Sequence, residues 1–486
     1  MKGVPDLLKI ERGCISAPAG CGKTHLIAST LARHDGAKPI LVLTHTNAGV
    51  AALKKRLDGL SVPPRNYRLA TIDGWALQLI STFPVRSGHD PALLELKIPS
   101  RDYPAIKAHT LSLLEAGHLN DVLKASYSRL LVDEYQDCMK PQHDIVVALA
   151  GLLPTCVLGD DLQCIFGWSG PKVDWHSEVL KIFPLAGELD VPHRWNNVGC
   201  HELGQWLLDI RPLLREGSPI DLLKAPKEVE WVEIAGPTDS PSLLKAARTA
   251  APVKGGSILI LCAGNNKKRQ QDVARHTPGA VVVENVDLTD FITFAETFSF
   301  NDAAATDDLI DFATSVMTGV DGSSMKARVK ALRNGTATKS ASNAEQAALD
   351  FALSPSPANA NTVLVEINKQ AGVRPHRPAI LSACLRTLNS CEDAEGFHEL
   401  AMSVREQQRV VGREIKGRAV GSTLLLKGLE ADVAVLLDTS SFSAQDLYVA
   451  LTRGARKIVV CSDSRVIKPK WRPQCGVAMY LRVPKL

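Results

Sequence analysis

Residues 14–30 read CISAPAGCGKTHLIAST, and this stretch decides the fold. An aliphatic run ends in a glycine-rich turn, which opens directly into a segment with helical spacing. A phosphate-binding loop requires this order of strand, loop and helix, because backbone N–H groups at a helix N-terminus can face an anion. The usual pattern begins with glycine, whereas this chain has Ala17. The loop therefore indicates a nucleotide site whose other parts must come from elsewhere in the chain.

The loop supplies most of the predicted nucleotide contacts. Its backbone amides are expected to meet the β-phosphate, the lysine to reach the β- and γ-phosphates, and the threonine hydroxyl to bind Mg²⁺. The residues concerned are Ala17, Gly20, Cys21, Gly22, Lys23 and Thr24. A glycine-rich turn with an accidental Lys-Thr pair is the competing interpretation, which the flanking strand and helix disfavour.

A second motif supplies a partner for the metal ion. RLLVDEYQD places Asp133 and Glu134 at the end of an aliphatic strand. An aspartate there can hold the Mg²⁺ shell, and the following glutamate can orient or deprotonate the attacking water. An Asp-Glu pair by itself is more often a solvated strand end. Together with the loop it predicts hydrolysis of a nucleoside triphosphate.

One strand further on, residues 157–170 read VLGDDLQCIFGWSG. Gln163 is an uncharged amide suited to sensing a γ-phosphate. Trp168 lies in a glycine-flanked loop, where an exposed aromatic ring suits stacking on a nucleic-acid base, worth roughly 1–3 kcal/mol per base. A packed core tryptophan is the alternative, and the sequence leaves both open for Trp168.

The distribution of apolar residues predicts an α/β fold. Short aliphatic runs such as 39–44 and 129–134 alternate with amphipathic stretches, which is typical of a parallel sheet covered by helices on both faces. Residues 1–184 are expected to form a first domain with a small helical insert at about 83–127. The remaining expected segments are a second α/β domain opening at 185–288, a helical insert at 289–407, and completion of that domain at 408–486. Further strands are expected at 229–234, 257–263, 280–284 and 419–426, and the Ala/Ser/Asn/Thr-rich stretch at 335–362 as a loop or linker.

The composition of the chain limits the possible functions less strictly than the motifs do. With 486 residues, more than one domain is expected, and a net charge of +4 permits a polyanionic partner without requiring one. The 11 cysteines include no Cys-x-x-Cys pair, which disfavours metal fingers and disulfide frameworks. No apolar run approaches the length of a membrane span, and the first residues lack the apolar core of a signal peptide. We expect a cytoplasmic protein with no membrane partner.

The ordered motifs resemble those of superfamily 1 helicases of the UvrD/Rep type. The segments that carry the resemblance are APAGCGKT, LVLTHTNAGVAALKKRL, LLVDEYQDC, VLGDDLQCIFGWSG, VPHRWNN, LLLKGLEADVAVLLD and LYVALTRGARK. They run from Ala17 to Lys457 in the family's order. In that family the loop commonly begins with alanine. The resemblance implies two RecA-like domains, ATP and Mg²⁺ as cofactors, and 3′–5′ movement on single-stranded DNA with possible unwinding of duplex.

The resemblance also implies roles for particular residues. Arg194 and Arg453 resemble the two arginines that contact the γ-phosphate, where guanidinium groups stabilise charge on phosphoryl oxygens. Glu430 resembles a glutamate near the ribose and phosphates. Thr46 and Asn47 fall in the segment that contacts DNA, and Trp168 resembles the base-stacking aromatic. Tyr448 is left as either a support for the arginine loop or a core residue.

Several positions depart from the family pattern. The N-terminal glutamine motif that reads adenine is missing, which puts purine selectivity in doubt. Residues that differ at positions facing DNA, or linking DNA to the ATP site, are His45, Asp73, Ser169, Leu424 and Leu426. The nucleotide machinery is therefore expected to be intact and the DNA track to be altered.

Size leads to a second functional hypothesis. Both expected inserts are short, and the compact form resembles the GajB family, the helicase-like subunits of the Gabija anti-phage system, which act with a separate nuclease. The alternatives are a translocating motor and a subunit that senses ATP and DNA ends and activates a partner nuclease. A P-loop metabolic kinase would leave Gln163, Trp168, Arg194 and Arg453 unexplained, and an iron–sulfur helicase lacks its cysteine cluster.

Overall fold

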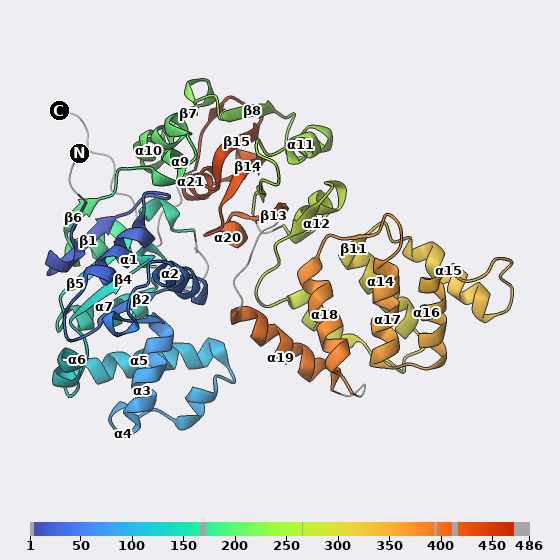
Figure 1. The fold of residues 1–486 in the computed structure, drawn as a ribbon, viewed down its shortest axis with the longest axis horizontal. Helices are drawn as coiled ribbons and strands as arrows, with labels where there is room; N and C mark the ends of the chain where they lie inside the picture. The colour runs from blue at the N-terminus through green and yellow to red at the C-terminus, as the bar shows by residue number, and fades with distance from the viewer. Residues whose placement is uncertain (1–3, 166–171, 265, 393–395, 411–416, 471–486) are drawn as a thin grey trace. The chain divides into compact units, whose positions relative to one another are not determined.

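The computed structural model describes residues 4–165, 172–264, 266–392, 396–410 and 417–470. Within these residues the chain divides into two compact units, each described by itself. Unit 1 comprises the described parts of 4–229, 442–456 and 466–470, and unit 2 comprises those of 230–441 and 457–465. Figure 1 labels their helices and strands.

Unit 1 is built on a six-stranded sheet in the order β3-β2-β4-β5-β1-β6. All five neighbouring pairs are parallel. The strands are β1 (Arg12–Ser16), β2 (Ile40–Thr44), β3 (Tyr67–Thr71), β4 (Arg129–Val132), β5 (Thr155–Gly159) and β6 (Leu185–Glu188). Strand β5 separates β1, which precedes the phosphate loop, from β4, which precedes Asp133. The carboxyl ends of parallel strands lie at one edge, so the predicted motifs share that edge.

Helices cover both faces of this sheet. Along β2, Ile40 and Val42 pack into one apolar cluster, and Leu41 and Leu43 pack into another. Successive strand residues point to opposite faces, so a strand buried on both faces is apolar throughout. The helices that follow the strands are α1 (Lys23–Arg33), α2 (Asn47–Gly59), α3 (Ile72–Thr82), α7 (Lys140–Ala150), α8 (Leu180–Ile182), α9 (His193–Asn196) and α10 (His201–Glu216). Unit 1 also contains α21 (Ala444–Leu451), from much later in the chain.

Between α3 and β4 the chain is helical. This segment contains α4 (Pro84–Ser87), α5 (Pro99–Glu115) and α6 (Asn120–Ser126). Helix α5 buries Ile106, Leu113 and Leu114 in the same apolar cluster as α3 and α7. This segment therefore shares the core of the first sheet.

Unit 2 contains most of a second six-stranded sheet, in the order β10-β13-β9-β14-β15-β8. Its strands are β8 (Val229–Glu233), β9 (Ile258–Cys262), β10 (Ala280–Val282), β13 (Arg418–Ser422), β14 (Ala431–Leu437) and β15 (Gly454–Ser462). The pairs β10–β13, β13–β9 and β9–β14 are parallel. Helices α11 (Ser240–Ala247) and α12 (Lys267–His276) contribute Leu243 and Val273 to the apolar cluster on this sheet. The predicted α/β class, with two six-stranded sheets and flanking helices, is confirmed.

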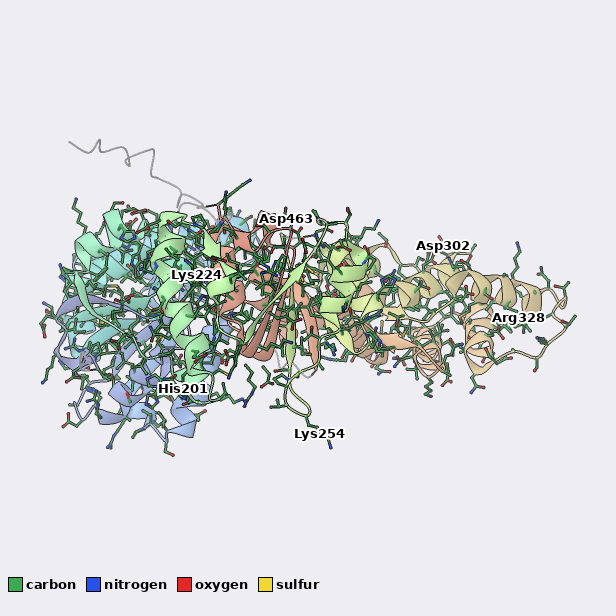
Figure 2. All side chains as sticks on the ribbon, turned by 90° about the horizontal axis from the view of Figure 1, so that it is seen from above. His201, Lys224, Lys254, Asp302, Arg328 and Asp463 are labelled. Carbon is green, nitrogen blue, oxygen red and sulfur yellow. The ribbon has the colours of Figure 1, made fainter. Side chains whose placement is uncertain are left out.

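The rest of unit 2 is mainly helical (Figure 1). It comprises α13 (Thr289–Thr297), α14 (Ala305–Val316), α15 (Gly322–Arg333), α16 (Asn343–Leu353), α17 (Pro357–Asn368), α18 (Pro378–Ser390) and α19 (Phe397–Val410), with the short pair β11 (Met317–Thr318) and β12 (Arg374–Pro375). On this part, labelled Arg328 of α15 pairs with Glu345 of α16 at 3.1 Å (Figure 2).

Three expectations differ from the structure. The stretch 335–362, predicted as a loop or linker, mostly forms α16 and α17, because Phe351, Ala360 and other small and apolar side chains face the helical core. The strand expected at 419–426 ends at Ser422, whose hydroxyl caps helix α20 (Thr423–Leu426). Residues from 185, expected to open the second domain, begin with β6, which pairs with β1 in unit 1. Among the described residues, no helix combines the length and apolar character needed to cross a bilayer.

Candidate nucleotide site

The predicted phosphate loop joins β1 to α1. Gly20 and Gly22 adopt left-handed backbone conformations, with φ of 71° and 88°, and these turn the chain sharply into the helix. Gly20 also needs its small size, because a Cβ there would lie 2.6 Å from Cζ3 of Trp195. Among the residues that the structure describes, no side chain caps the N-terminus of α1, so its first amides are available to an anion. The loop therefore has the backbone that phosphate binding requires.

Two carboxylates converge on the lysine at the start of α1. The Nζ atom of Lys23 lies 2.8 Å from Oδ1 of Asp133 and 2.5 Å from Oε1 of Glu134. Side chains of adjacent strand residues would point to opposite faces, but β4 ends at Val132 and Glu134 has a φ of 53°. This left-handed conformation is costly for a non-glycine residue. It brings both carboxylates to the same ammonium group.

The lysine is held in its charged form. Burial by itself would lower the pKa of the Lys23 ammonium, but Asp133 and then Glu134 outweigh burial, so the pKa is raised above its usual value. Lys23 therefore keeps its positive charge throughout the neutral range. A permanently charged ammonium at the head of an uncapped helix suits an anionic ligand such as a polyphosphate.

A second layer of amides connects Glu134 to Gln163. The Nε2 atom of Gln136 donates to Oε2 of Glu134 at 2.5 Å, and its Oε1 atom accepts the backbone N–H of Asp160 at 3.1 Å. Gln163 then donates from Nε2 to Oδ2 of Asp160 at 2.9 Å. Three of the predicted residues, Lys23, Glu134 and Gln163, are thus linked in the structure. The links run through Gln136 and Asp160, which were not among the predicted site residues.

Asp160 also forms the most deeply buried ion pair of this region. Arg211 of α10 donates to both its carboxylate oxygens, at 2.8 and 2.9 Å, and the two side chains are 4% and 1% exposed. Removing one partner of such a pair typically costs roughly 3–5 kcal/mol, because the other charge stays buried. Arg211 further donates to the Tyr448 hydroxyl at 2.7 Å. That hydroxyl accepts the backbone N–H of Ala19, in the phosphate loop, at 3.3 Å.

The two predicted arginines are Arg194 and Arg453. Arg194 contacts both the phosphate loop and the residue that precedes Arg453. The backbone N–H of Arg194 donates to Gly20 O at 3.1 Å, and its Nη1 atom donates to Thr452 O at 2.5 Å. Arg453 is 3% exposed and donates from Nε to Val449 O at 2.8 Å. In this arrangement Arg453 contacts the end of α21, and Arg194 joins that end to the phosphate loop.

A divalent cation would find two of its predicted protein ligands here. Thr24 stands at the first turn of α1, and Asp133 follows β4 at the same sheet edge. Mg²⁺ typically takes one or two protein oxygens, with phosphate oxygens and waters completing the shell. Within the described residues no group of three or more His, Cys, Asp or Glu forms a separate metal cluster. The donor set therefore fits a nucleotide-bound Mg²⁺.

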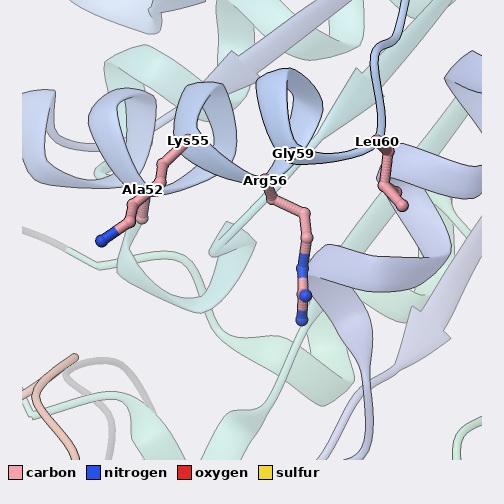
Figure 3. A pocket seen from close by; sticks show the side chains of 5 residues that line it. All are labelled: Ala52, Lys55, Arg56, Gly59 and Leu60. Carbon is pink, nitrogen blue, oxygen red and sulfur yellow. The ribbon is translucent and has the colours of Figure 1, made fainter.

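The residues predicted to contact DNA are placed less completely. Thr46 caps α2, accepting the Gly49 N–H at 3.1 Å, and Asn47 begins that helix; both are exposed. Further along α2, basic side chains border a surface hollow of about 340 Å³ (Figure 3). The hollow is lined by Ala52, Lys55, Arg56, Gly59 and Leu60. Trp168 and Ser169 lie outside the described residues.

The remaining predicted positions have local roles. Glu430 is exposed, directly before β14 in unit 2. Asp73 accepts from Nε2 of Gln142 at 3.0 Å and lies 3.5 Å from Nζ of Lys107. Leu426 is fully buried. Tyr448 is 1% exposed, as a core residue would be, and its hydroxyl also accepts the backbone N–H of Ala19 in the phosphate loop.

One segment of the chain matches a known family of protein domains. The model of the UvrD/REP helicase N-terminal domain matches residues 100–184. DNA helicase II of Salmonella typhimurium is 35% identical over 82 residues, which cover 17% of this chain and 11% of that protein. DNA helicase II of Escherichia coli is 34% identical over 82 residues, with the same coverage. The match thus spans about a tenth of these relatives. The segment matched by the domain model, residues 100–184, contains Asp133, Glu134 and Gln163.

A solved structure also aligns with most of the chain. It is described as a complex of Arterivirus nonstructural protein 10, a helicase, with DNA. The alignment covers 93% of this chain and 61% of the other, at 10% identity and a TM-score of 0.34. A TM-score this low does not establish a common fold.

Proposed function

We propose that this chain is a DNA-dependent ATPase of the superfamily 1 helicase type. The observation that carries the proposal is the Lys23 ammonium at the uncapped head of α1, within 2.8 Å of Asp133 and 2.5 Å of Glu134. An anion-binding helix end, a fixed positive charge and two carboxylates are the parts that phosphoryl transfer to water requires. The match over residues 100–184 supports the same type of enzyme.

The proposed roles follow from the chemistry of each side chain. Lys23 exchanges its carboxylate partners for phosphate oxygens when ATP binds, and Asp133 and Thr24 hold Mg²⁺. The cation supplies positive charge that stabilises the phosphoryl oxygens. Glu134 orients the attacking water and accepts its proton. Gln163 contacts the γ-phosphate.

The proposed charge stabilisers come from later in the chain. Arg194 and Arg453 oppose the charge that develops in the transition state. Glu430 is assigned to the ribose and phosphates through the resemblance alone, whereas Ala17 and Cys21 are assigned as parts of the phosphate-binding loop.

Single-stranded DNA is the proposed polymer substrate, with 3′–5′ translocation and possible unwinding of duplex. Thr46, Asn47 and the basic side chains along α2 supply groups that suit phosphate contacts. Trp168 is the proposed stacking platform. The polarity rests on the resemblance to UvrD/Rep helicases.

A second candidate is a cytoplasmic subunit of an anti-phage defence complex that senses ATP and DNA ends and activates a separate nuclease. The observation that favours it is Asp73. This residue replaces the family's usual histidine, and its carboxylate is bonded to Gln142 and Lys107 within the protein. A group committed to internal contacts is less suited to coupling DNA to the ATP site.

Steady-state ATP hydrolysis separates these candidates. The protein is assayed with no DNA, with short and long single strands, and with blunt duplex, and Lys23→Ala serves as the blank. Stimulation that grows with strand length supports a translocating motor. Stimulation by duplex ends regardless of length, or only after a nuclease partner is added, supports the sensor. Hydrolysis that Lys23→Ala leaves unchanged would refute the proposed site.

A further inference from the structure

One buried hydrogen-bonded path runs from the phosphate loop to the amide of Gln163. It begins at the Ala19 N–H, which donates to the Tyr448 hydroxyl at 3.3 Å, and continues to Arg211, whose Nη1 atom is 2.7 Å from that hydroxyl. Arg211 holds Asp160 through two bonds, and Asp160 accepts from Gln163 at 2.9 Å. Every side chain on this path is less than one-tenth exposed.

The geometry gives Arg211 a defined task. Its planar guanidinium binds the Asp160 carboxylate in a bidentate manner, which fixes orientation as well as charge. Its carbon Cζ also lies 5.0 Å from the centre of the Tyr448 ring. One side chain therefore sets the position of two others, and each of those contacts a predicted nucleotide-binding element directly.

We propose that Arg211 and Tyr448 are positioning residues, which hold the phosphate loop at Ala19 and the Gln163 amide in one nucleotide-binding geometry. The inference rests on the proposed ATPase function. Tyr448 belongs to α21, and this helix leads directly to Arg453. The path thus ties the phosphate loop, Gln163 and the segment of the second predicted arginine to a single buried side chain of α10.

The same helix offers a matched control. Arg215, one turn further along α10, binds Asp161 in a bidentate manner at 2.8 and 2.8 Å. This pair resembles the Arg211–Asp160 pair in geometry, and Asp161 is the next residue in sequence. No hydrogen bond in the described part of the chain links Arg215 to Tyr448 or to the phosphate loop, and Arg215 is not on the path.

The test measures the dissociation constant of the full chain for a fluorescent methylanthraniloyl-ATP, with thermal unfolding of each variant measured in parallel. Tyr448→Phe removes only the hydroxyl and keeps the Arg211–Asp160 pair. We expect it to weaken nucleotide binding about fivefold, the equivalent of one ordinary hydrogen bond. Arg211→Lys is expected to weaken binding by a similar factor, because lysine cannot hold both partners. Arg215→Lys should stay within about twofold of the unmodified protein.

The double variant gives the decisive readout. If the two residues act on one path, Arg211→Lys combined with Tyr448→Phe weakens binding no more than the stronger single change, whereas Arg215→Lys combined with Tyr448→Phe is additive. Unchanged nucleotide binding in Tyr448→Phe, with a lowered melting temperature, would show a structural role only and overturn the inference. That outcome leaves the proposed function standing. Failure of the unmodified protein to bind the nucleotide overturns the proposed function and the inference together.

Discussion

The Lys23 ammonium lies 2.8 Å from a carboxylate oxygen of Asp133, which joins the head of α1 to the end of β4 across the intervening strand β5. Lys23 lies 2.5 Å from Glu134 as well, so one positive charge faces two negative groups. Phosphate oxygens would offer Lys23 an equally charged alternative partner. The position of this lysine therefore decides whether the carboxylates are paired or available to cation and water.

Replacing Lys23 tests the site directly. Lys23→Ala is expected to abolish ATP hydrolysis, because it removes the charge at the helix head and leaves two carboxylates facing the phosphates. Steady-state phosphate release, with and without single-stranded DNA, is the measurement. Lys369→Ala removes an exposed lysine paired with Glu366 and should leave hydrolysis unchanged. DNA-stimulated turnover that survives in Lys23→Ala would show that the nucleotide binds elsewhere.

Replacing Glu134 separates binding from chemistry. Glu134→Gln keeps the size of the side chain and an oxygen that can still accept the hydrogen bond from Gln136. The amide, however, cannot accept the proton of the attacking water. We expect nucleotide affinity to be retained and single-turnover hydrolysis to fall by roughly 10²–10⁴. Glu95→Gln, an exposed change, is the control. A loss of nucleotide affinity equal to the loss in rate would instead assign Glu134 to binding.

Arg194 is expected to act on the transition state. An arginine that stabilises charge in phosphoryl transfer is worth roughly 10³–10⁵ in rate, so Arg194→Lys should reduce kcat by about that factor and change nucleotide affinity far less. The single-turnover rate and the nucleotide dissociation constant are measured separately and compared. Arg215→Lys serves as the matched control. If Arg194→Lys hydrolyses ATP at the unmodified rate, its bond to Thr452 is purely structural.

Trp168 is expected to contribute to DNA binding and not to basal ATP hydrolysis. The base-stacking assignment comes from the sequence, and loss of one stacked base costs roughly 1–3 kcal/mol. Trp168→Ala should therefore raise the DNA concentration needed for half-maximal stimulation by about fivefold or more while basal hydrolysis persists. Trp168→Phe keeps an aromatic face and should recover most of the stimulation. Loss of basal hydrolysis in Trp168→Ala would identify a core residue.

A buried histidine in unit 2 predicts a loss of stability in acid. His376 is fully buried, and neither ring nitrogen has a hydrogen-bond partner within the described residues. Burial, reinforced by Arg275, Arg377 and Arg374, lowers its pKa from the usual 6.5 to about 4. The unfolded chain therefore binds a proton first as pH falls below 6.5. The contribution of neutral His376 to the free energy of unfolding is therefore fully present above pH 6.5. It is lost progressively as the pH falls to about 4, by up to about 3 kcal/mol.

Denaturant unfolding of His376→Leu and the unmodified protein at pH 7 and pH 4.5 measures this effect. The two proteins should differ in the pH dependence of their free energy of unfolding, with His376→Leu losing less stability in acid. His276→Gln, an exposed histidine of unit 2, should retain the unmodified pH dependence. Equal losses in all three proteins would show that His376 does not control acid stability.

The local sequence was sufficient for β1, β2 and β4 of the first sheet and for the motifs at their carboxyl ends. The run ILVLT at 40–44 forms β2 because a strand covered on both faces must be apolar at every position. The pattern was insufficient at 335–362, where small and polar residues suggested a loop. Helices α16 and α17 form there because tertiary packing buries Phe351 and Ala360, and such burial overrides weak local propensity. The predicted domain boundary at 185 also differs from the structure, because β6 pairs with β1 of the first sheet. Such pairing is a tertiary contact that the local sequence does not specify.

The sequence by itself determined the phosphate loop, the Asp133–Glu134 pair and the Gln163 motif, because backbone turns and strand ends are local features that glycine and charged residues specify directly. Only the tertiary structure decided that Arg211 and Tyr448, 237 residues apart, meet between the loop and Asp160. An arginine on an amphipathic helix and a tyrosine in an apolar one carry no sign of their partners in sequence. Their contact depends on the packing of α10 and α21, which long-range burial fixes and local pattern does not.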